Sequence, residues 1–274
     1  DSVARLAAPN RVMAQDPDAR PDRVDTAPPP PHMPAPMLEL DLVGPSDVAA
    51  VPAPVPGDAP AQSPIMAVVL IEDPMRPLDP ATLAQIDFPV SLALDPAHPD
   101  APARAAALRA AGFEVVITGA AAMGDGPARD DLAAGLMQAF DLVPEAVALI
   151  DASPIGRIDV DLRWRAALRA VLGDGRHGLI RFAPGPDAPV GAGRPLVGGE
   201  AVVFRLLDDA DQRAPRIGRY LDRAAYAAGQ QGAVIVVGRT RPETMTALFA
   251  WARERADAPV RLAPVSAVLA RIGR

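Results

Sequence analysis

The chain has 274 residues and a formal net charge of −7; half of its residues are apolar and 4% are aromatic. The negative charge and the lack of an unbroken basic cluster exclude nucleic acid as a partner, because a phosphate backbone needs a concentrated basic face. The absence of cysteine excludes disulfides, thiolate metal sites and a cysteine nucleophile. No apolar run reaches the roughly 18 residues that span a bilayer. We expect that a signal peptide or anchor, cleaved or omitted, preceded Asp1, and that any membrane contact is made through it.

Residues 1–63 are rich in proline and alanine, with the densest proline runs at 28–31 and 52–56. Proline removes backbone donors and restricts the residue before it, so this segment is predicted to be a largely disordered tether. Its one apolar patch, Met37–Val43, is interpreted as part of a solvated linker, with an edge strand or a partner-docking segment as the alternative. Residues 64–274 form the predicted folded domain.

The folded domain begins with the apolar run Ile65–Ile71, which is followed by Glu72, Asp73 and Pro74. A continuous apolar run of this length is typical of a strand buried on both faces in a parallel sheet. The other predicted strands are 88–94, 113–118, 146–150, 178–182, 201–204, 233–238 and 260–263.

Amphipathic segments with helical spacing lie between most of these runs, at 101–111, 130–140, 162–172, 217–228 and 243–255. Gly112 and Gly173 stand where helix C-caps are expected, and the segment 240–243 has the spacing of a capping box. Alternating strands and helices predict a parallel α/β domain. A closed or nearly closed (β/α) barrel is the first interpretation. A doubly wound open sheet is the alternative, because strand periodicity alone does not separate the two.

Five segments in chain order resemble the motifs of the divergent polysaccharide deacetylases of bacterial envelopes. They are 71–73 for the family's Ile-Asp-Asp, 89–94 for a Pro-Val-Thr-Leu-Ala strand, 112–118 for Gly-His-Glu-Val-Leu-Leu-His, 233–245 for Ala-Ile-Ala-Ile-Gly-His-Pro-x-Pro-x-Thr-Leu, and 262–266 for Leu-Val-Pro-Leu-Ser. The sequence carries no dinucleotide fingerprint, phosphate loop or Gly-x-Ser-x-Gly elbow that would favour another activity. The resemblance implies an irregular, TIM-like (β/α) barrel of the polysaccharide-deacetylase type.

The resemblance also implies roles for particular positions. In active members of that family, the first acid of the pair is similar to a general base, and the second binds a divalent metal together with two histidines. Glu72 then occupies the place of the base, and Asp73 occupies the place of a metal ligand. Thr118 and Arg239 stand in the places of histidines.

The segment after the fourth strand, Asp151-Ala152-Ser153, stands where the family has Asn-His-Met-Gly-Ser, and it also lacks histidine. Metal-assisted amide hydrolysis needs a cation that lowers the pKa of its bound water, held by three nitrogen or carboxylate ligands. One aspartate and one threonine hydroxyl do not meet this need, and the charge of Arg239 repels a cation. We therefore expect no catalytic residue, no metal and no cofactor, with Glu72 and Asp73 as remnants of a site.

Other residues have both a structural and a functional interpretation. His98 is either a loop residue or, with Glu72 and Asp73, a ligand of zinc or another divalent metal. The acidic run 208–211 is either a helix start or a site for a hard cation such as calcium. Four arginines at strand ends are either surface residues or a rim that binds a carboxylate, a phosphate or a sugar acid; they are Arg181, Arg205, Arg239 and Arg241. The two tryptophans, Trp164 and Trp251, are expected to pack within helices, with stacking on sugars as the alternative.

The first functional hypothesis is a catalytically inactive, polysaccharide-deacetylase-like domain that is periplasmic, or membrane-tethered and facing the periplasm. It binds an envelope glycan or a periplasmic protein through a rim, whose residues are Glu72, Asp73, Thr118, Asp151, Ser153, Arg239 and Arg241. The second hypothesis is an active metal-dependent carbohydrate deacetylase with the ligands Asp73, Glu72 and His98. The third is a structural subunit that docks through its proline-rich arm. The sequence leaves the ligand and the oligomeric state open.

Overall fold

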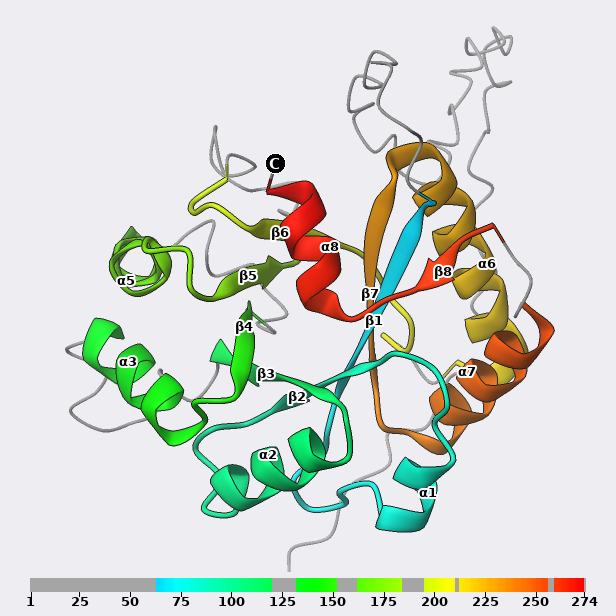
Figure 1. Ribbon diagram of the computed structural model, residues 1–274, viewed down its shortest axis with the longest axis horizontal. Helices are drawn as coiled ribbons and strands as arrows, with labels where there is room; N and C mark the ends of the chain where they lie inside the picture. Colours follow the sequence, from blue (N-terminus) through cyan, green and yellow to red (C-terminus); the bar gives the residue numbers. More distant parts are fainter. Residues whose placement is uncertain are drawn as a thin grey trace, which may run out of the picture. The chain divides into compact units, whose positions relative to one another are not determined.

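The computed structural model describes residues 63–119, 132–151, 162–183, 195–209, 212–255 and 259–273 (Figure 1). The tether predicted for 1–63 lies outside these residues, apart from Ser63. The predicted apolar runs form a parallel sheet. Its strands are β1 Ile65–Ile71, β2 Ser91–Leu94, β3 Glu114–Thr118, β4 Ala146–Asp151, β5 Gly178–Arg181, β6 Glu200–Leu206, β7 Ala233–Arg239 and β8 Arg261–Leu262.

Strand β1 closes this sheet into a barrel. It pairs with β7 along its whole length, and its C-terminal half pairs with β2 through three residue pairs, from Val69↔Ser91 to Ile71↔Ala93. The order β1 to β7 is therefore a closed ring of parallel strands, while the short β8 pairs with the start of β1. The (β/α) barrel interpretation is confirmed, and the open-sheet alternative is wrong because β1 and β2 are hydrogen-bonded to each other.

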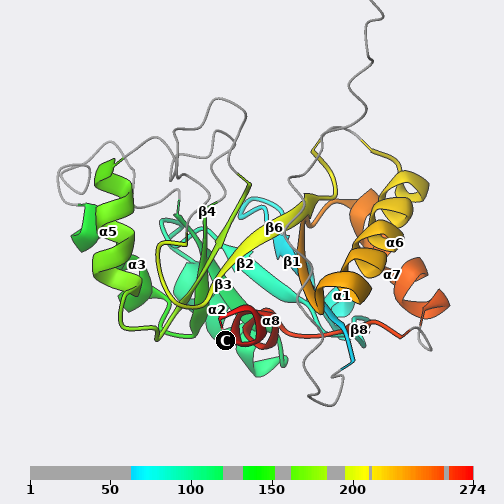
Figure 2. The same ribbon diagram turned by 90° about the horizontal axis from the view of Figure 1, so that it is seen from above.

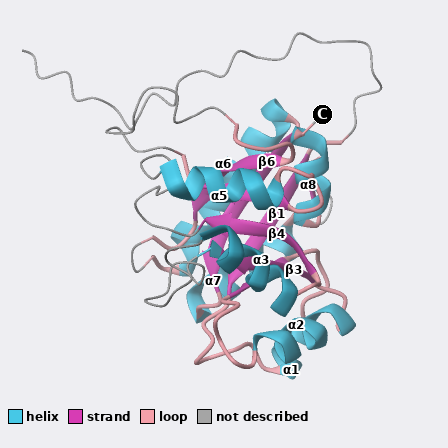
Figure 3. Ribbon diagram, turned by 90° about the vertical axis from the view of Figure 1, so that its left-hand side faces the viewer, coloured by secondary structure: helices cyan, strands magenta, loops and turns pink. Residues whose placement is uncertain are grey.

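Helices pack on the outside of the ring, except for the last described helix, which lies at its N-terminal end. They are α1 Pro80–Ala84, α2 Ala101–Ala110, α3 Leu132–Leu142, α5 Leu162–Leu172, α6 Ala214–Gln231, α7 Pro242–Glu254 and α8 Val265–Ile272. Helices α6 and α7 pack on each other beside β7 and β1, and α3 packs against α5 on the opposite side of the strands (Figures 1 and 2). Figure 3 shows the strands enclosed by these helices. Within the described ranges, no helix has both the length and the apolar character needed to cross a bilayer.

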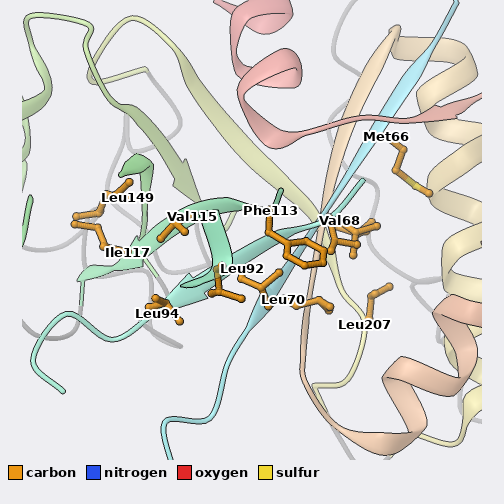
Figure 4. Close-up of a cluster of buried hydrophobic side chains, with 14 of the residues drawn as sticks. Met66, Val68, Leu70, Leu92, Leu94, Phe113, Val115, Ile117, Leu149 and Leu207 are labelled. Atoms are coloured by element: carbon orange, nitrogen blue, oxygen red, sulfur yellow. The ribbon is translucent and has the colours of Figure 1, made fainter. Parts of the chain in front are cut away.

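Both faces of strand β1 are buried in the barrel wall. Successive strand residues point to opposite sides, so Ala67 and Val69 face the interior of the barrel while Val68 and Leu70 face the helices; all four side chains are completely buried. Figure 4 shows part of the outer layer between the strands and the helices. This double burial is why β1 is a continuous apolar run rather than an alternating one.

Helix α8 fills the N-terminal end of the barrel. Its Val265, Val268 and Leu269 side chains belong to the interior cluster, and the helix contacts β1, β6 and β7. Glu114 of β3 accepts hydrogen bonds from the backbone N–H and the hydroxyl of Ser266. The carboxylate thus satisfies a free N–H in the first turn of α8 and faces the positive end of the helix dipole. The barrel interior is closed at this end.

The structure corrects several local predictions. Helices α1 and α8 are not predicted from the sequence because both are short, and each begins at or just after a proline. The predicted capping box is wrong, because the helix begins at Pro242 and the Thr240 hydroxyl lies 3.5 Å from the backbone N–H of Asp73 instead. Trp164 and Trp251 are 1% and 5% exposed, which confirms them as packing residues.

Candidate functional site

The carboxyl ends of the seven ring strands meet at the end of the barrel opposite α8, which we call the mouth. The residues that end these strands, or follow them closely, are Asp73, Asp95, Thr118, Asp151, Phe182, Asp208 and Arg239. Barrel enzymes build their sites at this end because the loops after the strands converge there. Large parts of the loops after β3, β4 and β5 lie outside the described residues. The described part of the mouth is therefore formed mainly by β1, β2, β6 and β7.

Glu72 is buried at the end of β1 and forms an ion pair with Arg104 of α2. Arg104 Nε lies 2.8 Å from Glu72 Oε2, and its Nη2 lies 2.6 Å from Oε1. Oε1 also accepts a hydrogen bond from the backbone N–H of Leu78 at 2.9 Å. Glu72 continues the series of β1 residues that faces the helices, so its carboxylate points to α2 and not into the barrel. The two carboxylate oxygens of Glu72 thus connect α2 and the β1–α1 loop to the barrel wall.

Asp73 is exposed and continues the inward-facing series of β1. Its Oδ1 accepts a hydrogen bond from the backbone N–H of Met75 at 2.9 Å. His98 lies in the loop between β2 and α2, where its Nδ1 accepts a hydrogen bond from the backbone N–H of Asp100 at 3.3 Å. His98 and Glu72 line one small pocket of about 80 Å³, together with Arg104, but Asp73 does not line it. The three residues of the alternative metal set are thus not assembled around one cavity.

Thr118 and Asp151 end the neighbouring strands β3 and β4, and both are buried, with 6% and 5% exposure. Thr118 is in register with Ile150, and Asp151 is in register with Arg181 of β5. Ser153 lies outside the described residues. The structure therefore brings Thr118 and Asp151 to the mouth, and the proposed contribution of Ser153 stays a prediction.

Arg239, the last residue of β7, is held by Asp208, which follows β6. The backbone N–H of Arg239 donates to Asp208 Oδ2 at 2.8 Å, and its Nη1 donates to Oδ1 and to the backbone oxygen of Asp208, both at 3.0 Å. The hydroxyl of Thr244 in α7 donates to Oδ2 at 2.9 Å. The Asp208 side chain is 2% exposed, while that of Arg239 is 40% exposed. A buried carboxylate thus anchors a guanidinium that reaches solvent.

The other three arginines at strand ends have surroundings that differ from those of Arg239. Arg181 is buried and forms an ion pair with Glu200. Arg205 lies over the ring of Tyr220 in α6, with its guanidinium carbon 3.8 Å from the ring centre. Arg241 is exposed and precedes α7. Arg239 differs from Arg181 and Arg205 in that its partly exposed guanidinium is bound to a buried carboxylate at the mouth.

The donor set does not fit a metal ion of the kind that the resemblance implies. Among the described residues, no group of three or more His, Asp or Glu side chains is arranged to hold a cation. At the position of one expected histidine, Thr118 offers a single hydroxyl, and at another stands the cationic Arg239. Glu72 already uses both oxygens in hydrogen bonds. We therefore derive no chemical step through a metal.

The sequence did not reveal the two residues that organise this end of the barrel. Asp208 was predicted to begin a helix or to bind calcium; the structure shows that α6 begins only at Ala214 and that Asp208 is bound by Arg239 and Thr244. Arg104 lies on an alanine-rich helix and belongs to no motif that would single it out. A signal existed for Asp208 in its position, directly after a strand that neighbours the one ending in Arg239.

Comparisons with known proteins agree with this architecture. The family model "Divergent polysaccharide deacetylase" matches residues 199–269. An uncharacterized protein, ATU2773 from Agrobacterium tumefaciens C58, has a similar structure with a TM-score of 0.59 and 17% identity, over 78% of this chain and 92% of that chain. A mutant of BA3943, described as a CE4 family pseudoenzyme with restored enzymatic activity, is similar with a TM-score of 0.50 and 11% identity, over 76% of this chain and 68% of that one. No curated protein matches the sequence.

The family match covers β6, α6, β7, α7, β8 and most of α8, and it contains Asp208, Arg239 and Thr244. The two solved structures extend the similarity of fold over about three quarters of the chain. The resemblance to the divergent polysaccharide deacetylases, inferred from the motifs, is therefore confirmed: the chain is a (β/α) barrel with the sequence signature of that family in its C-terminal part.

Proposed function

We propose that this protein is a catalytically silent member of the deacetylase-like barrels, and that it binds a glycan of the bacterial envelope at its mouth. The single observation that carries the proposal is the Asp208–Arg239 pair. It places a fixed, partly exposed guanidinium where the resemblance puts a metal-binding histidine. A guanidinium at this point has no lone pair with which to bind a metal ion, whereas it donates hydrogen bonds to the oxygens of a sugar.

Two further observations support binding rather than catalysis. Glu72, in the place of the general base, has both oxygens in hydrogen bonds to Arg104 and Leu78. Asp73 is exposed at the end of β1, the strand next to β7, which ends in Arg239. The two strand ends are connected through Thr240, whose backbone N–H donates to the backbone oxygen of Ile71 at 3.1 Å. A carboxylate and a guanidinium on adjacent strands provide an acceptor and a donor for sugar hydroxyl groups.

The setting is part of the proposal. The family signature points to glycans of the bacterial envelope, so we place the protein in the periplasm, or on a membrane anchor that faces it. One protein of similar structure is described as a CE4 family pseudoenzyme. This supports the proposal that a barrel of this type can serve a role other than catalysis. A periplasmic protein partner and docking through the arm at 1–63 are the alternative roles.

The test is the metal content and the activity of the full chain, purified without chelator and then equilibrated with excess zinc. We expect no stoichiometric zinc and no acetate release from N-acetylated oligosaccharides, together with binding to envelope glycan that weakens in Asp73→Ala. Asp87→Ala is the matched control, because Asp87 is an exposed acid just before β2, at the other end of the barrel. Stoichiometric zinc that disappears in Asp73→Ala, accompanied by acetate release, would overturn the proposal in favour of the metal-dependent deacetylase.

A further inference from the structure

Among the described residues, the guanidinium of Arg239 makes hydrogen bonds through only one of its donor nitrogens. Its Nη1 donates twice to Asp208, whereas no hydrogen bond involves its Nε or Nη2 in the described structure. In Arg104, by contrast, Nε and Nη2 both donate hydrogen bonds to the two carboxylate oxygens of Glu72. Nε–H and Nη2–H point in parallel from one edge of the group and match two oxygens of a carboxylate. At the mouth of the barrel, that edge of Arg239 is unused.

The unused edge is also held in place before any ligand arrives. Arg239 is tied to Asp208 through its backbone N–H as well as its Nη1, and Asp208 is fixed in turn by Thr244, which is completely buried. Gly238 allows this close approach, since a Cβ at that position would lie 3.0 Å from Thr244 Cγ2. A donor pair fixed in this way loses little side-chain entropy on binding. It is suited to a planar, two-oxygen acceptor.

The charges around Arg239 narrow the class of ligand. The buried carboxylate of Asp208 balances the charge of Arg239, and the exposed carboxylate of Asp73 adds a negative charge beside Thr240. A dianionic phosphate gains little attraction at such a site, because no net positive charge is present to offset it. A singly charged carboxylate gains two charge-assisted hydrogen bonds with less repulsion.

We propose that Arg239 binds the carboxylate of an acidic sugar residue through Nε and Nη2, and that Asp208 and Thr244 are its positioning residues. This inference rests on the proposed glycan-binding function and names the ligand class at the same site. Arg239→Lys keeps the charge but removes the parallel donors, so it is expected to weaken binding about tenfold, in line with the loss of a charge-assisted hydrogen bond. Thr244→Val is expected to weaken binding less and to reduce the preference for acidic over neutral sugars.

The experiment follows the Nε–H resonances of arginine in the full chain labelled with ¹⁵N. Galacturonate, glucuronate and N-acetylmuramate are the acidic probes, and galactose, glucose and N-acetylglucosamine are their neutral controls. We expect one Nε–H resonance, which is absent in Arg239→Lys, to shift with the acidic probes alone. Arg253→Lys, which changes an exposed arginine in the last turn of α7, outside the rim, is expected to leave that response intact. The folded state of each variant is checked by its thermal unfolding curve.

The outcomes separate the two proposals. If neutral and acidic sugars shift the resonance equally, or if envelope glycan binds while the resonance stays fixed for every acidic probe, the carboxylate inference is wrong and the glycan-binding function stands. If neither free sugars nor envelope glycan bind, both proposals fail. A shift with acidic probes that persists in Thr244→Val with its full preference would remove the positioning role.

Discussion

Arg104 of α2 donates hydrogen bonds to both carboxylate oxygens of Glu72 at the end of β1; the Arg104 side chain is 20% exposed and the Glu72 side chain is 2% exposed. The position that the family resemblance assigns to a catalytic base therefore connects a helix to the barrel wall. Because Glu72 is buried, the contribution of the ion pair to stability is best measured by removing Arg104. A carboxylate left alone in such a place has neither water nor a counter-charge.

We predict that Arg104→Ala lowers the free energy of unfolding by about 3 kcal/mol, since it leaves the charge of Glu72 buried and unpaired. Urea denaturation of the full chain measures this change. Arg176→Ala is the matched control, because Arg176 pairs with Asp174 while 81% exposed, and its loss is expected to change stability by less than about 0.5 kcal/mol. Adding Glu72→Leu to Arg104→Ala is expected to recover part of the loss. Equal effects of the two arginine substitutions would contradict this account.

Two glycine-to-alanine substitutions are predicted to change the stability of the protein in opposite directions. At Gly178, a Cβ would lie 2.5 Å from Leu269 Cδ1 and 3.2 Å from the backbone oxygen of Gly199, so Gly178→Ala is expected to push the buried Leu269 side chain out of place and to cost about 1–3 kcal/mol. At Gly218, inside α6, a Cβ meets nothing within 4 Å, and alanine is expected to stabilise the helix by about 0.5–1 kcal/mol. Thermal unfolding of both variants checks the pair. A loss at Gly218 would show that α6 is not packed as described.

Glu243 gives the protein a predictable response to acid. Its carboxylate accepts a hydrogen bond from the backbone N–H of Ala214 at 2.8 Å and lies 3.3 Å from Arg213, and these contacts, the backbone one first, hold the pKa of Glu243 below its ordinary value of 4.5. A lowered pKa contributes stability above the unfolded-state value, and this contribution is lost as the pH falls through the folded-state value.

We therefore predict that Glu243→Gln is less stable than the parent chain at neutral pH, and that the difference shrinks as the pH falls below about 4.5. Unfolding curves measured between neutral and acidic pH show this convergence. Glu254→Gln, at the other end of α7, serves as the control. A difference that stays constant over the whole pH range would assign the effect to side-chain shape rather than charge.

The strands could be predicted because most of them are buried on both faces and leave an apolar run. Strand β6 is apolar as well, although Val202 and Phe204 on its outer face are exposed. Periodicity alone did not separate a closed barrel from an open sheet, because closure depends on whether β1 and β2 pair and side-chain periodicity is the same in both; the family resemblance favoured the barrel, which is confirmed. The Asp208–Arg239 and Glu72–Arg104 pairs join residues that are 31 and 32 positions apart. Neither pair could be deduced from local spacing. The family resemblance singled out Glu72 and Asp73, but it did not show which direction each side chain faces.

The place of α8 in the barrel has a consequence for how the molecule is made. This helix is the last described element of the chain, and it seals an interior whose other walls come from β1 onward. Because α8 follows every ring strand in the sequence, the apolar inner face of the ring stays uncovered until α8 has been synthesised. A chain cut just before Val265 would keep every ring strand and still expose Ala67, Ile235 and their neighbours to water. Such a truncated product is expected to aggregate or to be degraded rather than to persist as a smaller domain.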